Sequence, residues 1–191
     1  MTLSAVLLAG GESLRMGEDK ATIVIAQRPI WQRQVEVLRN LRPERIFISV
    51  RRMPSWSAPE TELLLDKAPS RGPLSGLSRA LTEMESTHLI ALAVDMPFMT
   101  TTELLAQCEH ASEGVGVVPI FQSRAEPLAA VYPKEASQEF AAALAGPNFS
   151  LQSVVRGLAQ SGKVHLREIS EEALNLYRSV NEPGDLKCAR P

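Results

Sequence analysis

The sequence predicts an α/β protein with three layers, in which helices cover both faces of a mostly parallel, Rossmann-like sheet. Short apolar runs typical of buried strands alternate along the chain with segments of helical periodicity. The first apolar run leads directly into a glycine-rich loop, and sheets of this type bind ligands at the carboxyl ends of their strands. The 191 residues suit one such domain, residues 1–191, and are too few for two domains that each bury a core of this kind.

The first half of the chain contains the elements predicted around the glycine loop. Residues 3–8 form an apolar first strand, and Pro29 opens a helix that ends near Pro43. The run from His88 to Val94 is almost entirely apolar, as expected for a parallel strand covered on both faces. The other elements predicted here are strands at 45–50 and 62–65 and a helix from the Gly72 turn to about Met84.

The second half continues the alternation of strands and helices. Thr100 and Glu103 form a capping-box pattern for a helix that reaches about His110. Ser150 is expected to cap a helix that runs through Gln160. The remaining predicted elements are strands at 115–120, 128–132 and 164–169, a helix at 133–145 and a short helix at 170–177.

Composition and charge exclude several classes of function. The net charge is −2, from 20 basic and 22 acidic residues. The chain therefore lacks the excess of positive charge that attracts nucleic acid, and no nucleic-acid partner is expected. Cys108 and Cys188 are too few and too far apart for a disulfide framework, which favours a reducing cytoplasm. No apolar stretch approaches the roughly 18 residues of a membrane span. We therefore expect a soluble, cytoplasmic protein with no membrane partner.

The glycine loop is a candidate phosphate site. Gly10 and Gly11 let the backbone turn sharply and bring N–H groups close to an anion, while Arg15 and Lys20 add positive charge. No Gly-Lys-Ser or Gly-Lys-Thr follows, and the spacing does not match the dinucleotide fingerprint, so both common phosphate-loop motifs are excluded. The alternative is a plain tight turn beside solvated charges.

Two carboxylates follow other predicted strands. Asp66 comes after the strand at 62–65, and Asp95 after the strand at 88–94, so both are expected in the same crevice as the glycine loop. Asp95 is the candidate metal ligand, because Mg²⁺ prefers oxygen ligands and takes one or two carboxylates plus nucleotide phosphates. The alternative is that each carboxylate only forms a turn. For Asp95, this would be the turn beside Pro97.

The remaining polar residues carry weaker signals. Arg51 and Arg52 follow the strand at 45–50 and are interpreted as a solvated loop end, with contact to an acidic substrate as the alternative. The histidines are interpreted as structural, and neither cysteine lies in a nucleophile motif.

Residues 8–20 resemble the signature of the molybdenum cofactor guanylyltransferases, Leu-Ala-Gly-Gly-x-Ser-x-Arg-Met-Gly-x-Asp-Lys, with all ten specified positions present. This family lies within the nucleotidyltransferases of the sugar-nucleotide type. The resemblance extends to Leu186, through the glycine segment at 72–77, the strand end at 94–98, the segment at 124–132 and the stretch at 179–186. The chain departs from the family at Ser179, which replaces an Asn, and at residues 27–30, which replace Gly-x-Pro-Leu.

The resemblance implies a set of site residues. Arg15, Lys20 and Asp95 would be catalytic, and Asp95 would hold Mg²⁺. The acceptor side would include Ser49, Arg124, Pro127 and Asn181. The implied nucleotide-binding residues are Leu8, Ala9, Gly10, Gly11, Lys20, Asp66, Gly72, Pro73, Leu74, Gly76 and Asp95.

The implied reaction is transfer of GMP from GTP to the terminal phosphate of molybdenum-loaded molybdopterin, with release of pyrophosphate. GTP is favoured over CTP because relatives that use CTP carry Leu-Ala-Ala-Gly where this chain has Leu8-Ala9-Gly10-Gly11. The implied partners are GTP, molybdopterin, the molybdenum-insertion enzyme and a GTP-binding accessory protein of the same pathway. The alternatives are a related enzyme that uses CTP or another phosphorylated acceptor, and an inactive nucleotide-binding regulatory module.

Overall fold

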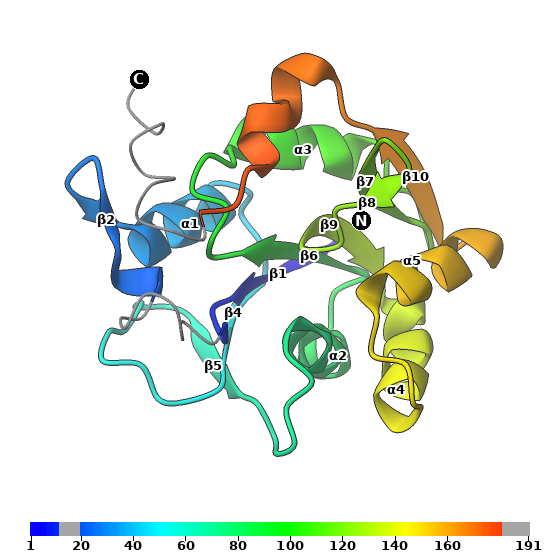
Figure 1. Ribbon diagram of the computed structural model, residues 1–191, viewed down its shortest axis with the longest axis horizontal. Coiled ribbons are helices and arrows are strands. Elements are labelled where there is room, and N and C mark those ends of the chain that lie inside the picture. Colours follow the sequence, from blue (N-terminus) through cyan, green and yellow to red (C-terminus); the bar gives the residue numbers. More distant parts are fainter. Residues whose placement is uncertain (12–19, 181–191) are drawn as a thin grey trace.

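A mixed β-sheet runs through the middle of the molecule, with helices on both of its faces (Figure 1). The structure is a computed structural model that describes residues 1–11 and 20–180. The strands lie side by side in the order β10-β7-β9-β6-β1-β4-β5, and β8 pairs with β7. The predicted three-layer α/β architecture is confirmed.

Most neighbouring strands of the sheet are parallel. β1 (Leu3–Leu8) lies between β4 (Arg45–Val50) and β6 (His88–Ala93), and β5 (Glu62–Leu65) extends the sheet beyond β4, all in parallel. On the other side, β10 (Val164–Glu168) is parallel to β7 (Gly116–Phe121). The antiparallel strands are β8 (Arg124–Ala125) and β9 (Ala129–Pro133).

The direction of β9 follows from its short connection. Residues 122–128 separate β7 from β9, whereas a parallel crossover needs a dozen residues or more. The chain therefore turns back through the β7–β8 hairpin and enters the sheet between β7 and β6 in the opposite direction.

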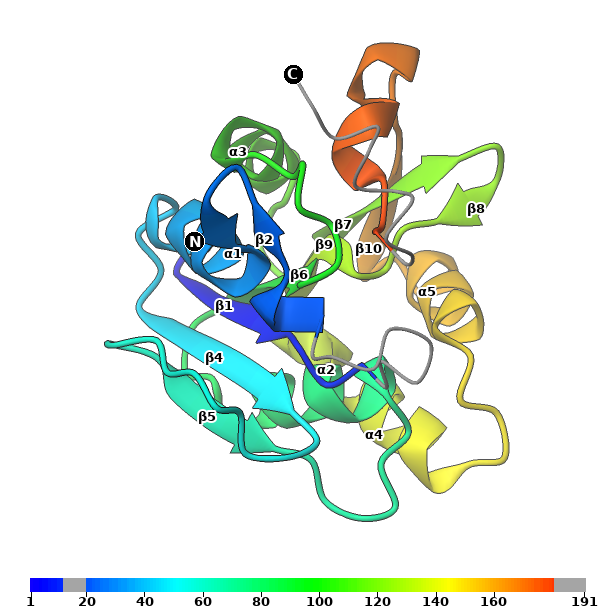
Figure 2. The same ribbon diagram turned by 60° about the vertical axis from the view of Figure 1, so that its left-hand side comes forward.

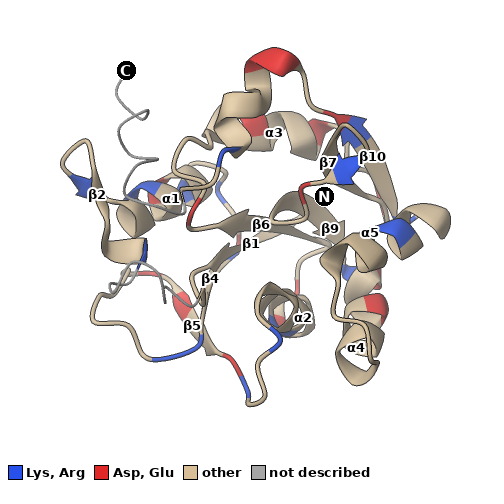
Figure 3. Cartoon of the chain, viewed as in Figure 1, with Lys and Arg blue, Asp and Glu red and all other residues tan. Residues whose placement is uncertain are grey.

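Alternate residues of the same strands form two separate cores. Ala5 and Leu7 of β1 belong to the core under α1 (Ile30–Arg39) and α3 (Thr101–Glu109). Val6 and Leu8 belong to the core under α2 (Pro73–Glu83), α4 (Ser137–Ala145) and α5 (Leu151–Gln160). This alternation is the two-residue period of a strand buried on both faces. Figure 3 shows β1 and β6 without charged residues, as burial on both faces requires.

Several predicted helix ends are confirmed and others need correction. Thr100 Oγ1 accepts a hydrogen bond from Glu103 N at 3.2 Å, which confirms that cap. Ser150 is the N-cap residue of α5, as predicted, but its side chain makes no cap hydrogen bond, and its N–H donates to Asn148 Oδ1. The helix predicted from Pro133 begins later, because β9 includes Pro133 and the 3₁₀ turn η2 (Lys134–Ala136) precedes α4. The last predicted helix is the 3₁₀ helix η3 (Glu171–Tyr177).

Two hairpins have no counterpart in the sequence prediction. One joins β2 (Val24–Ile25) to β3 (Arg28–Pro29), just after the 3₁₀ turn η1 (Lys20–Thr22), and the other joins β7 to β8. Their turn residues, Ala26-Gln27 and Gln122-Ser123, have positive φ angles between 47° and 67°. Such turns normally carry Asn or Gly, so their usual sequence signal is missing here.

Gly76 sets the distance between α2 and the sheet. A Cβ atom at this position would lie 2.3 Å from Ser49 Oγ and 2.8 Å from Leu8 Cδ2. We expect Gly76→Ala to lower the free energy of unfolding by about 1–3 kcal/mol, because overpacking forces the helix or its neighbours to move. Denaturant unfolding measures this change. Gly157→Ala, on the exposed side of α5 where a Cβ has no described neighbour within 4 Å, serves as the control and should not destabilise the protein. An unchanged stability of the Gly76 variant would contradict the packing role.

In the described part of the chain, no helix is both long and apolar enough to cross a membrane.

Candidate nucleotide-binding cleft

A cleft opens at the carboxyl ends of the parallel strands β6, β1, β4 and β5. Figure 2 shows the ends of β1 and β4 close to the start of α2. Gly10, Gly11, Asp66 and Asp95 all line this cleft, which confirms the prediction that the glycine loop and the two carboxylates share one crevice. The residues that line the cleft are Leu8, Ala9, Gly10, Gly11, Lys20, Ser49, Asp66, Gly72, Pro73, Ala93, Val94, Asp95 and Leu128.

The start of the glycine loop is held by main-chain hydrogen bonds. Ala9 N–H donates to Ser49 O at 2.9 Å, and Val94 N–H donates to Leu8 O at 3.1 Å, so the loop leaves β1 from a fixed position. A Cβ at Gly10 would lie 3.3 Å from both the N and Cγ atoms of Arg51, whereas no described atom lies within 4 Å of a Cβ at Gly11. Gly10 therefore permits a close approach of two strand ends.

Asp95 is the carboxylate at the β6 end of the cleft. It is half-buried, and burial raises its pKa, while the positive charge of Lys20 acts in the opposite direction. The cost of burying this charge would be offset further by a bound cation. The described residues contain no cluster of three or more His, Cys, Asp or Glu side chains that could hold a metal by themselves. A carboxylate that is not part of such a cluster suits Mg²⁺, which takes one or two carboxylates and completes its shell with phosphates and water.

Asp66 organises the opposite end of the cleft. Its Oδ2 accepts a hydrogen bond from Ser70 Oγ at 2.6 Å, and its Oδ1 accepts one from Ser49 Oγ at 3.3 Å. Ser70 Oγ also accepts a hydrogen bond from Gly72 N–H at 3.1 Å. Asp66 therefore ties the end of β4 to the loop that leads into α2. Each of its oxygens keeps lone pairs for a ligand.

The structure separates the predicted nucleotide-binding residues into two groups. Most of them line the cleft, but Leu74 and Gly76 do not: Leu74 is buried in the core under α2, and Gly76 packs against Ser49 and Leu8. Arg15 lies outside the described residues.

The predicted acceptor residues are scattered. Ser49 lies in the cleft as the partner of Asp66, whereas Arg124 is exposed on β8, and neither Arg124 nor Pro127 is part of the lining. Pro127 is buried, and its carbonyl oxygen accepts a hydrogen bond from Tyr132 OH at 2.7 Å. Asn181 lies outside the described residues.

Three lining residues, Ala93, Val94 and Leu128, were not predicted, because apolar residues at strand ends give no chemical signal in the sequence. Arg51 was assigned to a solvated loop end, but its side chain lies against Gly10 and Gly72. A cation directly after a strand end, at the same edge as the glycine loop, was the signal that could have found it.

His88 and Cys108 lie outside the cleft. His88 is buried, with Nδ1 3.0 Å from Thr87 Oγ1 and Nε2 3.0 Å from Ser112 O, which agrees with a structural role. Burial raises the pKa of the Cys108 thiol to about 11, so it stays protonated near neutral pH and is no nucleophile there.

The segment after β10 returns to the cleft through a buried polar cluster. Tyr177 OH donates to Glu103 Oε1 at 2.6 Å and accepts from Gln107 Nε2 at 3.0 Å, and Arg167 Nη1 donates to the same carboxylate oxygen at 2.7 Å. Beyond this cluster, Val180 N–H donates to the carbonyl oxygen of Asp95 at 2.7 Å. The chain that leads to Asn181 is thereby attached next to the candidate metal ligand.

Replacing Tyr177 by Phe should therefore destabilise the protein by about 1–3 kcal/mol, because the buried Gln107 amide loses its acceptor and Glu103 loses a donor. Thermal unfolding followed by circular dichroism measures the effect. A melting temperature equal to that of the unaltered chain would mean that the cluster does not hold this segment.

The fold and the strand-end cleft together define a nucleotidyltransferase: residues 5–164 match the MobA-like NTP transferase domain. The chain belongs to the molybdenum cofactor guanylyltransferase family. It is 33% identical over 189 residues to a probable molybdenum cofactor guanylyltransferase of Opitutus terrae, covering 96% of this chain and 92% of that protein. It is 29% identical over 195 residues to a probable member from Clostridium perfringens, covering 96% and 95% of the two chains.

Solved structures agree at the level of the fold. The molybdopterin-guanine dinucleotide biosynthesis protein A of Archaeoglobus fulgidus superposes with a TM-score of 0.76 at 21% identity, covering 98% of this chain and 96% of that one. The 2-C-methyl-D-erythritol 4-phosphate cytidylyltransferase of Thermus thermophilus superposes with a TM-score of 0.70 at 16% identity, covering 99% and 97%.

Proposed function

We propose that the protein transfers GMP from GTP to the terminal phosphate of molybdenum-loaded molybdopterin, forming the guanine dinucleotide and releasing pyrophosphate. One observation carries this proposal: in a chain of this family, the glycine loop, Lys20, Asp66 and Asp95 meet in one cleft across the strand ends. In the same proposal, residues 1–191 act as one cytoplasmic nucleotidyltransferase domain. Its protein partners would be the molybdenum-insertion enzyme and a GTP-binding accessory protein.

The cleft residues can perform this reaction without a general base. The attacking phosphate monoester has a second pKa near 6 and is largely ionised at pH 7. The protein then has to align the attacking phosphate with the α-phosphate of GTP and to compensate the negative charge of both substrates. Lys20 and the main-chain N–H groups of the glycine loop would hold the phosphates of GTP, with Arg15 as a further cation.

Asp95 would hold Mg²⁺ at the end of the cleft where Lys20 also lies. Mg²⁺ bound there would stabilise the charge that develops on the α-phosphate and the leaving pyrophosphate. Asp66 and the small residues at the start of α2 are left to hold the nucleoside, because they line the opposite end.

Thermal unfolding with a panel of nucleotides tests the choice of GTP. A ligand that binds only the folded state stabilises it by mass action, so GTP with Mg²⁺ should raise the melting temperature more than CTP, UTP or ATP. An equal or larger shift with CTP would contradict the assignment of guanine and favour a cytidylyltransferase. Pyrophosphate release from GTP and molybdopterin separates an active enzyme from an inactive regulatory module.

A further inference from the structure

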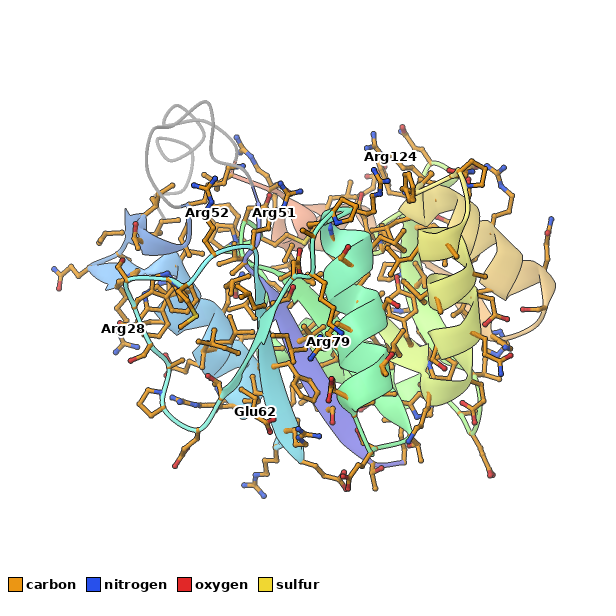
Figure 4. All side chains as sticks on the ribbon, turned by 90° about the horizontal axis from the view of Figure 1, so that it is seen from below. Arg28, Arg51, Arg52, Glu62, Arg79 and Arg124 are labelled. Atoms are coloured by element: carbon orange, nitrogen blue, oxygen red, sulfur yellow. The ribbon has the colours of Figure 1, made fainter. Side chains whose placement is uncertain are left out.

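Arg51 lies beside the cleft, where its side chain packs against Gly10 and Gly72, two of the residues that line it. It is the first residue after β4, and the Val50 carbonyl before it accepts a hydrogen bond from Asp66 N–H at 2.9 Å. Its Cγ lies 3.3 Å from the position of a Cβ at Gly10, and its Nη2 lies 3.5 Å from that of a Cβ at Gly72. The stem of the side chain therefore passes beside Gly10, and the guanidinium ends at Gly72. In Figure 4, Arg51 and Arg52 follow β4 at the same edge of the molecule; Arg52 is exposed, whereas Arg51 is half-buried.

The order of the strands divides the cleft into a phosphate end and a base end. Asp95 follows β6, the glycine loop follows β1, Arg51 follows β4 and Asp66 follows β5, and these strands are neighbours in that order. Three strand spacings amount to roughly 14 Å, enough for a nucleotide to lie across the strand ends. With phosphates beside Lys20 and Asp95, the base lies at the side of β4 and β5. The tip of Arg51 is at this second end, away from the cationic end of the cleft.

A guanidinium at the base end matches one edge of guanine. Guanine presents two adjacent acceptors, O6 and N7, to which arginine donates two parallel hydrogen bonds. Adenine presents an amino donor beside N7, and cytosine presents an amino donor, so neither accepts this pair of bonds. We infer that Arg51 is a specificity-determining residue that donates to O6 and N7 of the guanine of GTP. This inference rests on the proposed use of GTP.

The test combines a conservative substitution with a change in the ligand. Arg51→Lys keeps the charge and much of the stem but replaces the planar pair of donors with a single ammonium group, and 7-deaza-GTP lacks the N7 acceptor. The dissociation constants of GTP, 7-deaza-GTP and ATP are measured with Mg²⁺ by calorimetry, with Arg52→Lys as the matched control on the neighbouring exposed residue.

The unaltered protein should bind GTP more tightly than 7-deaza-GTP. Arg51→Lys should weaken GTP binding by roughly 5- to 150-fold, the range that corresponds to one bidentate contact with a base. The variant should discriminate less between GTP and 7-deaza-GTP than the unaltered protein does, with ATP binding unchanged, and Arg52→Lys should retain the original preferences.

Two results would overturn the inference. Equal affinity of the unaltered protein for GTP and 7-deaza-GTP would show that N7 is not contacted, without any variant being needed. A loss of affinity in Arg51→Lys by the same factor for all three nucleotides would assign Arg51 to the phosphates or ribose. An unaltered protein with no preference for GTP over ATP would instead reject the proposed use of GTP.

Discussion

Asp95→Asn should lower turnover by about 10³-fold, because metal stabilisation of the transition state contributes several kcal/mol and each 1.4 kcal/mol is a factor of ten. The substitution preserves the shape of the side chain and removes the charge that attracts Mg²⁺. The variant should need much more Mg²⁺ for its residual turnover, even at saturating GTP. GTP binding should survive in weakened form, held by the glycine loop and Lys20.

The same substitution should leave the unliganded protein at least as stable as before. Burial raises the pKa of Asp95, so its charged form is disfavoured in the fold, and this cost grows as pH rises through that pKa. Thermal unfolding at neutral pH without Mg²⁺ measures this. Asp66→Asn, in the same cleft, is the matched control: it should weaken nucleotide binding and leave the Mg²⁺ dependence of turnover unchanged. If the Asp95 variant keeps the turnover and the Mg²⁺ dependence of the unaltered protein, Asp95 is a turn residue beside Pro97 and not a metal ligand.

Lys20→Ala should lower turnover by about 10²-fold or more, because the lysine offsets phosphate charge in the cleft. Its positive charge also lowers the pKa of Asp95 against the effect of burial. Without this charge the pKa of Asp95 rises, so the acidic limb of the pH–rate profile should move to higher pH. Steady-state kinetics across the acidic range measures both effects.

The circular dichroism spectrum of the Lys20 variant should match that of the unaltered chain. Lys134→Ala, an exposed lysine in the turn after β9, is the control and should keep normal turnover. A Lys20 variant with normal turnover and an unmoved pH profile would identify Lys20 as an ordinary surface charge.

The strands that build the cleft could be predicted because each is marked by its own residues. The runs at 3–8, 45–50, 62–65 and 88–94 are apolar and end at a glycine or a polar residue, so their carboxyl ends were predictable. Since parallel strands present these ends at one edge, the glycine loop, Asp66 and Asp95 could be placed together from the sequence alone.

Features that depend on the meeting of distant segments could not be predicted. The position of Arg51 directly after a strand indicates the edge of the sheet where it lies, but not that Gly10 and Gly72 approach it from two other elements. The hairpin turn at Ala26-Gln27 lacks the residues that usually mark its conformation. Gly76 follows the family pattern, but only the packing of α2 reveals its contact with Ser49.

The fate of labelled GTP tests the proposed reaction most directly. The protein is incubated with Mg²⁺, molybdenum-loaded molybdopterin and GTP labelled at either the α- or the γ-phosphate, and the products are separated and identified by mass spectrometry. The proposed reaction predicts that the α-label enters a guanine dinucleotide of molybdopterin and that the γ-label leaves in pyrophosphate, while CTP labelled at the α-phosphate transfers little. Transfer of the α-label from CTP in preference to GTP, or no transfer from either nucleotide to molybdopterin, would contradict it.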